Sequence, residues 1–271
     1  MAHRKDVYKY GKYIEYEYKC AGKYGAKGEK RAPKKKATPE QMQKQNQWQK
    51  EKIILRKLRY NFEAGDLWVT LKFPKGTRMR GKDLCAIWSK FYRKLKYQYD
   101  KRKQIFKFFC RLDIGKKGGV HIHFAVNRLE GTPGTTEIIT EIWKEFGKRL
   151  YYTPMYEEGD FKELASYIAK PVSEEAIKGQ LSLFGEEEEI EAFTRYSCSR
   201  NLKMPEGKPH KYKRRTIRKL VEEGPTPTPG YYIDRDSIRY GENPHTHETY
   251  YYYTEIKLDE HVEERWEGDD G

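Results

Sequence analysis

The chain has 271 residues, which is ample for a sizeable core, and 37% of them are hydrophobic and 35% charged. The first residues lack an apolar signal region, no stretch approaches the roughly 20 apolar residues of a membrane helix, and the four cysteines include no C-x-x-C pair. These observations argue against a membrane span, a zinc ribbon and a disulfide framework, and we expect a soluble cytoplasmic protein. The formal charge of +14, together with 23 tyrosines, favours a nucleic-acid partner, with simple solubility charge as the alternative.

The first 60 residues have three different textures. Residues 7–19 alternate aromatic or apolar with charged side chains, which predicts one strand with tyrosines on one face. Residues 20–36 combine Gly and Pro with seven cations and one acid, which predicts a mobile basic arm. Thr38, Pro39 and Glu40 then supply an N-cap, a proline at the first helical position and a first-turn acid, so we expect a helix from there toward Arg59.

The middle of the chain alternates strand signals with helix signals. Enrichment in β-branched and aromatic residues predicts the strands, and apolar residues three or four apart predict the helices. In chain order we expect strand 67–73, helix 82–99, strands 105–113 and 120–127, helix 135–149, an extended run to 156 and helix 161–170. The glycine-rich turn after residue 113 predicts an antiparallel pair. This order indicates an α+β fold, an antiparallel sheet with helices packed on one face.

The texture changes again beyond residue 172. Residues 225–230, P-T-P-T-P-G, predict an extended linker, and the tyrosine-rich segments 231–240 and 250–258 predict a final hairpin. The segment 195–202, R-Y-S-C-S-R-N-L, is interpreted as a structural turn, with DNA contact as the alternative. We therefore divide the chain into an N-terminal strand, arm and helix (1–60), a central domain (61–172) and a C-terminal accessory region (173–271).

Two histidines stand at alternate positions of the apolar strand V-H-I-H-F. Residues i and i+2 of a strand point to one face, so His121 and His123 should project side by side. Asp113 ends the preceding strand, and the folded hairpin would bring its carboxylate toward the imidazoles. Two imidazoles and a carboxylate suit a divalent ion that polarises a phosphoryl group. The alternative is a half-buried strand with imidazoles on its outer face and a turn-capping acid.

A later helix carries a second candidate group. Tyr167 and Lys170 are three residues apart, and Glu163 precedes the tyrosine by four, so the three should share one helix face. A tyrosine beside a cation and a metal loses its proton more readily than its usual pKa of about 10 permits, which would make it a nucleophile toward phosphorus. In a chain with 23 tyrosines, ordinary helix packing is the alternative.

The ordered set L-W-V-T-L-K-F, V-H-I-H-F and L-A-S-Y-I-A-K resembles the three motifs of the HUH-endonuclease superfamily. The resemblance is to the rolling-circle replication initiators (Rep proteins) of phages, plasmids and mobile elements, and it covers residues 60–172 in order, spacing and hydrophobicity. It implies a ferredoxin-like, five-stranded antiparallel sheet whose central strand carries His121 and His123.

The resemblance also implies the chemistry. Tyr167 would attack the scissile phosphodiester of single-stranded DNA, yielding a 5′-phosphotyrosyl link and a free 3′-hydroxyl that primes replication. His121, His123 and Asp113 would hold Mn²⁺ or Mg²⁺, with Asp113 standing where relatives usually carry a Glu. Lys170 would orient the metal site or the phosphate.

The two-tyrosine version of the family's helix motif is absent, because position 163 is a Glu. In some single-tyrosine initiators such a Glu activates water in the terminating cleavage, which is the role expected for Glu163; a solvated helix acid is the alternative. The expected partners are single-stranded DNA at a replication origin and, since the chain has no P-loop, a host helicase and polymerase. A relaxase, a single-tyrosine transposase and a non-catalytic nucleic-acid-binding protein with the same fold remain as alternatives.

Overall fold

A computed structural model of the chain describes residues 3–20, 38–115, 119–147, 149–155, 161–171, 192–242 and 249–258, apart from the side chains of Cys20 and Arg214. Except for the backbone of Cys20, the predicted basic arm at 20–36 lies outside these ranges. The chain forms two compact units. We call Lys44–Met204 the central unit, and Met1–Gln43 together with Pro205–Gly271 the terminal unit.

The terminal unit contains a five-stranded antiparallel sheet and one described helix, α6 (Arg214–Glu223). The strand order is β8 (Gly207–Lys211), β1 (His3–Tyr10), β2 (Tyr13–Cys20), β10 (Thr249–Lys257) and β9 (Tyr231–Glu242). Ile217 of α6 packs with the buried rings of Tyr18, Tyr251 and Tyr253. The pairing of β9 with β10 confirms the predicted final hairpin.

Residues 7–19 form two strands, so the prediction of one strand with tyrosines on one face is wrong. Tyr10 pairs with Tyr13 across a two-residue turn, in which Gly11 has a φ of +49° that glycine tolerates best. Tyr8 pairs with Glu15, so Tyr16, the next residue along, points to the opposite face. The turn reverses the phase of the alternation, and a linear pattern does not record that reversal.

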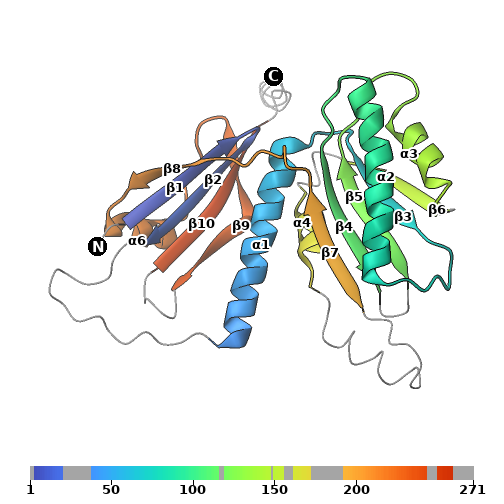
Figure 1. Ribbon diagram of the computed structural model, residues 1–271. Helices are drawn as coiled ribbons and strands as arrows, with labels where there is room; N and C mark the ends of the chain where they lie inside the picture. The colour runs from blue at the N-terminus through green and yellow to red at the C-terminus, as the bar shows by residue number, and fades with distance from the viewer. Residues whose placement is uncertain are drawn as a thin grey trace, which may run out of the picture. The chain divides into compact units, whose positions relative to one another are not determined.

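The central unit contains a second five-stranded antiparallel sheet (Figure 1). Its strand order is β6 (Arg149–Pro154), β3 (Leu67–Lys72), β5 (Val120–Val126), β4 (Phe108–Ile114) and β7 (Phe193–Cys198). The strand that carries His121 and His123 is therefore the central one, as expected. Strand β7 was missed, because segment 195–202 was interpreted as a turn; its residues instead pair with β4 along the sheet edge.

One face of this sheet carries the larger core. Every second residue of the three middle strands faces α2 (Gly81–Lys101) and α3 (Thr135–Trp143), including the fully buried Val69, Ile122 and Phe124. The predicted stripe on α2 packs into this core with Phe91 and Trp143 at its centre. Helix α3 ends at Trp143, six residues before its predicted end.

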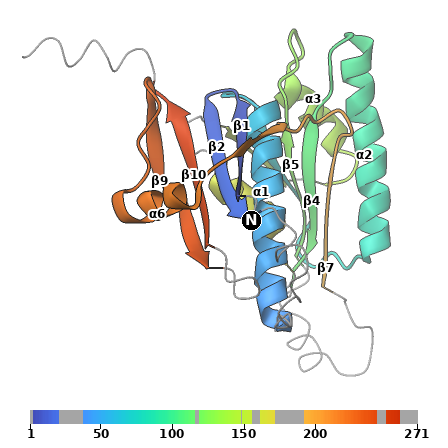
Figure 2. The ribbon, with the colours of Figure 1, turned by 90° about the vertical axis from the view of Figure 1, so that its left-hand side faces the viewer.

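The opposite face is also covered by helices, so the prediction of helices on one face only is wrong. Helices α1 (Pro39–Asn61) and α4 (Lys162–Ala169) pack against Phe109 and Ala125 of the sheet (Figure 2). The start of α1 is as predicted, because the Thr38 hydroxyl accepts a hydrogen bond from the Gln41 amide and the Gln41 side chain accepts one from Thr38. No helix in the described ranges is both long and apolar enough to cross a membrane.

The packing of α1 predicts the cost of removing its central anchor. Leu58 is fully buried against the sheet, so Leu58→Ala should lower the free energy of unfolding of the central unit by about 2–5 kcal/mol. Ile53 lies on the same helix and is 45% exposed, so Ile53→Ala should change it by less than about 0.5 kcal/mol. Urea denaturation would measure both, and equal effects would contradict the packing described.

Candidate active site

The register of the central sheet aligns two rows of side chains on the face that α4 covers. The first row runs across β7, β4, β5, β3 and β6 as Tyr196, Arg111, His123, Thr70 and Tyr151. The second row runs across the same strands as Thr194, Asp113, His121, Lys72 and Arg149. Cross-strand partners point to one face, so the hairpin of β4 and β5 brings Asp113 beside His121 as the sequence predicted.

The two imidazoles lie side by side in neutral form. Their ring centroids are 5.7 Å apart, and the His123 ring stacks on Trp68 at 6.0 Å. Burial lowers the pKa of His123 to about 4, and burial followed by the nearby Lys72 ammonium lowers the pKa of His121. At neutral pH both rings therefore keep an unprotonated nitrogen, which is the form that binds metal ions.

The surroundings of His123 fit a metal ligand. Its Nδ1 lies 3.1 Å from the Thr70 hydroxyl, and its Nε2 is buried without a hydrogen-bond partner among the described residues. When Nδ1 donates to Thr70, Nε2 presents a lone pair, as in metal-bound histidines held by an outer partner. Within the described ranges, however, no group of three or more His, Cys, Asp or Glu side chains is arranged to hold an ion. The two imidazoles fit, and Asp113 as the third ligand stays a prediction.

Helix α4 carries Tyr167 to this pair of rows. Its apolar side, including Ala165 and Ile168, is buried against the sheet, which leaves Tyr167 38% exposed. The Tyr167 ring meets the His123 ring edge-on at 5.0 Å, and its hydroxyl lies 3.3 Å from Oδ2 of Asp113. The structure thus brings the predicted nucleophile, one imidazole and the predicted carboxylate into mutual contact.

The Tyr167 phenol is a neutral hydrogen-bond donor at rest. Burial raises its pKa to about 12, and the negative charge of Asp113 raises it further, while the Arg111 guanidinium opposes both effects. A phenolate at neutral pH would therefore need an additional positive charge nearby.

Residues 66–176 match a family model of replication-associated proteins, the ORF2 family. The matched segment is about two fifths of the chain and contains all the predicted site residues. No curated protein and no solved structure matches the chain. The match supports a protein similar to the Rep proteins of rolling-circle replication.

The sequence interpretation missed Arg111, a buried arginine that joins the parts of the site. It is only 5% exposed, and its Nε donates to Oδ2 of Asp113 at 2.6 Å. The Thr194 hydroxyl donates to the other oxygen of the same carboxylate at 2.6 Å. The Nη1 of Arg111 donates to three carbonyls at the end of α4: those of Tyr167 at 2.6 Å, Ile168 at 3.0 Å and Lys170 at 2.7 Å. An arginine inside the apolar run F-F-C-R-L-D was a signal, because arginine is seldom buried without a partner.

A second cation stabilises the end of α4. The Lys50 ammonium, from α1, donates to the Ala169 carbonyl at 2.9 Å. Carbonyls at a helix C-terminus carry partial negative charge and have no partner within the helix, so both cations complement it. Together Arg111 and Lys50 fix the helix end that follows Tyr167.

The remaining two predicted site residues lie around Tyr167 on the exposed side. Glu163 is exposed in the first turn of α4, one turn before Tyr167. Lys170 is exposed and follows the last helical residue, Ala169, so it lies just past the helix end that Pro171 was predicted to set. The roles of both residues stay predictions.

Removing the buried guanidinium should be costly. Arg111→Met leaves the Asp113 carboxylate and several carbonyls without their donor, so we expect the central unit to lose about 3–5 kcal/mol of stability. The exposed Arg195 on β7 is the matched control, and Arg195→Met should cost less than about 0.5 kcal/mol. Adding Asp113→Leu to Arg111→Met should recover part of the loss in urea denaturation. Equal stability of the two arginine variants would contradict the role of Arg111.

Proposed function

We propose that the chain is a metal-dependent, single-tyrosine nicking and joining enzyme of the HUH type, which initiates rolling-circle replication on single-stranded DNA. One observation carries the proposal: the exposed Tyr167 hydroxyl lies beside Asp113 and the His123 ring, on the central strand of the sheet. The family match over residues 66–176 supports the same biological process.

In the proposed cleavage, Tyr167 Oη attacks the scissile phosphorus while the bond from phosphorus to the 3′-oxygen breaks. The tyrosine becomes linked to the 5′-phosphate, and the departing 3′-oxygen takes up a proton to become a hydroxyl. Asp113 Oδ2 accepts the phenol's hydrogen bond at 3.3 Å, so its carboxylate is the acceptor through which that proton leaves. The free 3′-hydroxyl then primes synthesis, and its attack on the phosphotyrosine would reverse the reaction and join strands.

The neutral imidazoles of His121 and His123 would hold the divalent ion, Mn²⁺ or Mg²⁺, with Asp113 as the proposed third ligand. Such an ion polarises the phosphoryl oxygens and supplies the positive charge that the raised pKa of Tyr167 calls for. Thr70 keeps the His123 ring oriented through its 3.1 Å contact to Nδ1.

Two further side chains complete the proposed cycle. The exposed Lys170 ammonium, just beyond the helix, would neutralise and orient the phosphate. Glu163 would accept a proton from water in the terminating cleavage, so that hydroxide attacks the phosphorus in place of a second tyrosine. A host helicase and polymerase would extend the primed 3′-end.

The nucleophile is tested by a substitution that removes only one oxygen. Tyr167→Phe should abolish the covalent adduct with labelled single-stranded origin DNA on a denaturing gel. DNA affinity should change by less than about tenfold, because a hydrogen bond contributes only about 0.5–1.5 kcal/mol. Tyr97→Phe, on the 62% exposed Tyr97 of α2, should leave the adduct unchanged. Adduct formation by Tyr167→Phe would refute the assignment, and tight binding without any adduct in the unaltered protein would favour a non-catalytic role.

The metal site is tested by binding as well as by activity. Chelator should abolish nicking, and the double variant His121→Ala with His123→Ala should lose both nicking and Mn²⁺ binding measured by calorimetry. The control is His210→Ala, which alters an exposed histidine on β8 and should keep both properties. Unchanged Mn²⁺ affinity in the double variant would exclude these imidazoles as ligands.

A further inference from the structure

Each edge of the first row ends in an exposed tyrosine with a lysine over its ring. On β7, Tyr196 is 44% exposed and the Lys50 ammonium lies 4.5 Å from its ring centroid. On β6, Tyr151 is 51% exposed and the Lys72 ammonium lies 4.6 Å from its ring centroid. Such pairs present an aromatic surface next to a cation, the combination that single-stranded nucleic acid requires for its bases and its phosphates.

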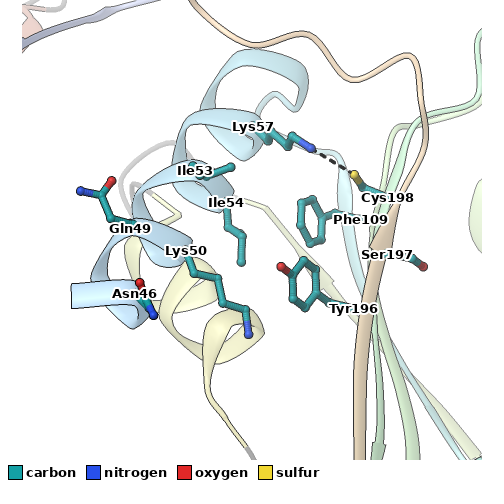
Figure 3. A pocket seen from close by; sticks show the side chains of 10 residues that line it. All are labelled: Asn46, Gln49, Lys50, Ile53, Ile54, Lys57, Phe109, Tyr196, Ser197 and Cys198. Atoms are coloured by element: carbon teal, nitrogen blue, oxygen red, sulfur yellow. Dashed lines mark hydrogen bonds between the residues drawn. The ribbon is translucent and has the colours of Figure 1, made fainter. Parts of the chain in front are cut away.

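A cavity of about 340 Å³ lies next to Tyr196 (Figure 3). It is lined by α1 on one side, with Lys50 and Lys57, and by Tyr196 and Phe109 of the sheet on the other. The rings of Tyr196 and Phe109 are stacked, with centroids 6.2 Å apart and planes 14° apart. The volume lies at the lower end of small-ligand sites, about 300–1,000 Å³, which suits one planar heterocycle.

The two tyrosines flank the candidate active site on the same face. Tyr196 and Tyr151 are each two strands away from His123, and strands in a sheet lie about 4.8 Å apart, so each is about 10 Å from the central strand. Tyr167 stands against His123 between them. A chain that crosses the sheet along this row would meet an aromatic–cation pair, then the nucleophile, then a second aromatic–cation pair.

We propose that single-stranded DNA crosses the sheet along this row, with a base from one side of the scissile phosphate in the cavity against Tyr196 and a base from the other side against Tyr151. Lys50 and Lys72 would contact the adjoining phosphates. The inference rests on the proposed function in placing the scissile phosphate at Tyr167. It assigns to Tyr196 the DNA contact that was an alternative for its segment, and it adds Tyr151.

The test is binding of a fluorescein-labelled oligothymidylate, measured by anisotropy with the full chain carrying Tyr167→Phe. Tyr196→Ala and Tyr151→Ala should each weaken binding by about 5- to 100-fold, as expected for the loss of one stacked base. Tyr196→Phe and Tyr151→Phe keep the ring and should bind nearly as the parent does. Tyr97→Ala, on the helix-covered opposite face, is the matched control and should have no effect.

The path itself is tested by oligonucleotide length. The two edge strands are four spacings apart, about 19 Å, so the losses should add in the double variant for a long oligothymidylate. They should not add for one too short to span the sheet. Unchanged affinity in both alanine variants would overturn the inference even if the Tyr167 adduct forms. Reduced affinity in both, without any Tyr167 adduct in the parent protein, would retain the path and reject the proposed function.

Discussion

The site depends on one buried guanidinium. Arg111 lies beneath Tyr167, with its Cζ 5.1 Å from the ring centroid, while it donates to Asp113 and to the carbonyls that end α4. A buried cation is stable only when its donors are satisfied, and here the partners are the carboxylate and the helix end themselves. The tyrosine and the carboxylate are therefore held at a fixed separation by the residue that both require. Movement of α4 would leave charge and carbonyls unpaired.

The sheet provides the other constraint, because register determines which residues meet. His123 is placed opposite Arg111 on one side and Thr70 on the other, and His121 is placed opposite Asp113. Each of these neighbours has a different effect: the arginine positions, the threonine orients, and the carboxylate accepts a proton. Trp68 packs on His123 and meets Tyr167 edge-on, which limits the water around the ring pair. Positions on rigid strands hold such a group more accurately than a loop does.

Local patterns predicted the parts of the site whose placement depends on strand parity or on a short hairpin. His121 and His123 share a face because their spacing is two, and Asp113 reaches them because only a short turn separates the strands. Strand β7 could not be found this way, since its pairing with β4 spans more than 80 residues and its sequence carries no strong alternation. The joining of the N-terminal hairpin with the C-terminal strands into one unit was hidden for the same reason. Arg111 was visible in the sequence, but its partners at the end of α4 were not.

The central claim is that Tyr167 is the residue that becomes linked to DNA. The most direct measurement is mass spectrometry of the covalent adduct after digestion with nuclease and protease, to identify the peptide and side chain that retain the nucleotide. The account predicts a 5′-linked nucleotide on Tyr167 and on no other residue. A nucleotide on Tyr196 or Tyr151, the other exposed tyrosines of the same face, would contradict it, as would attachment through a residue other than tyrosine.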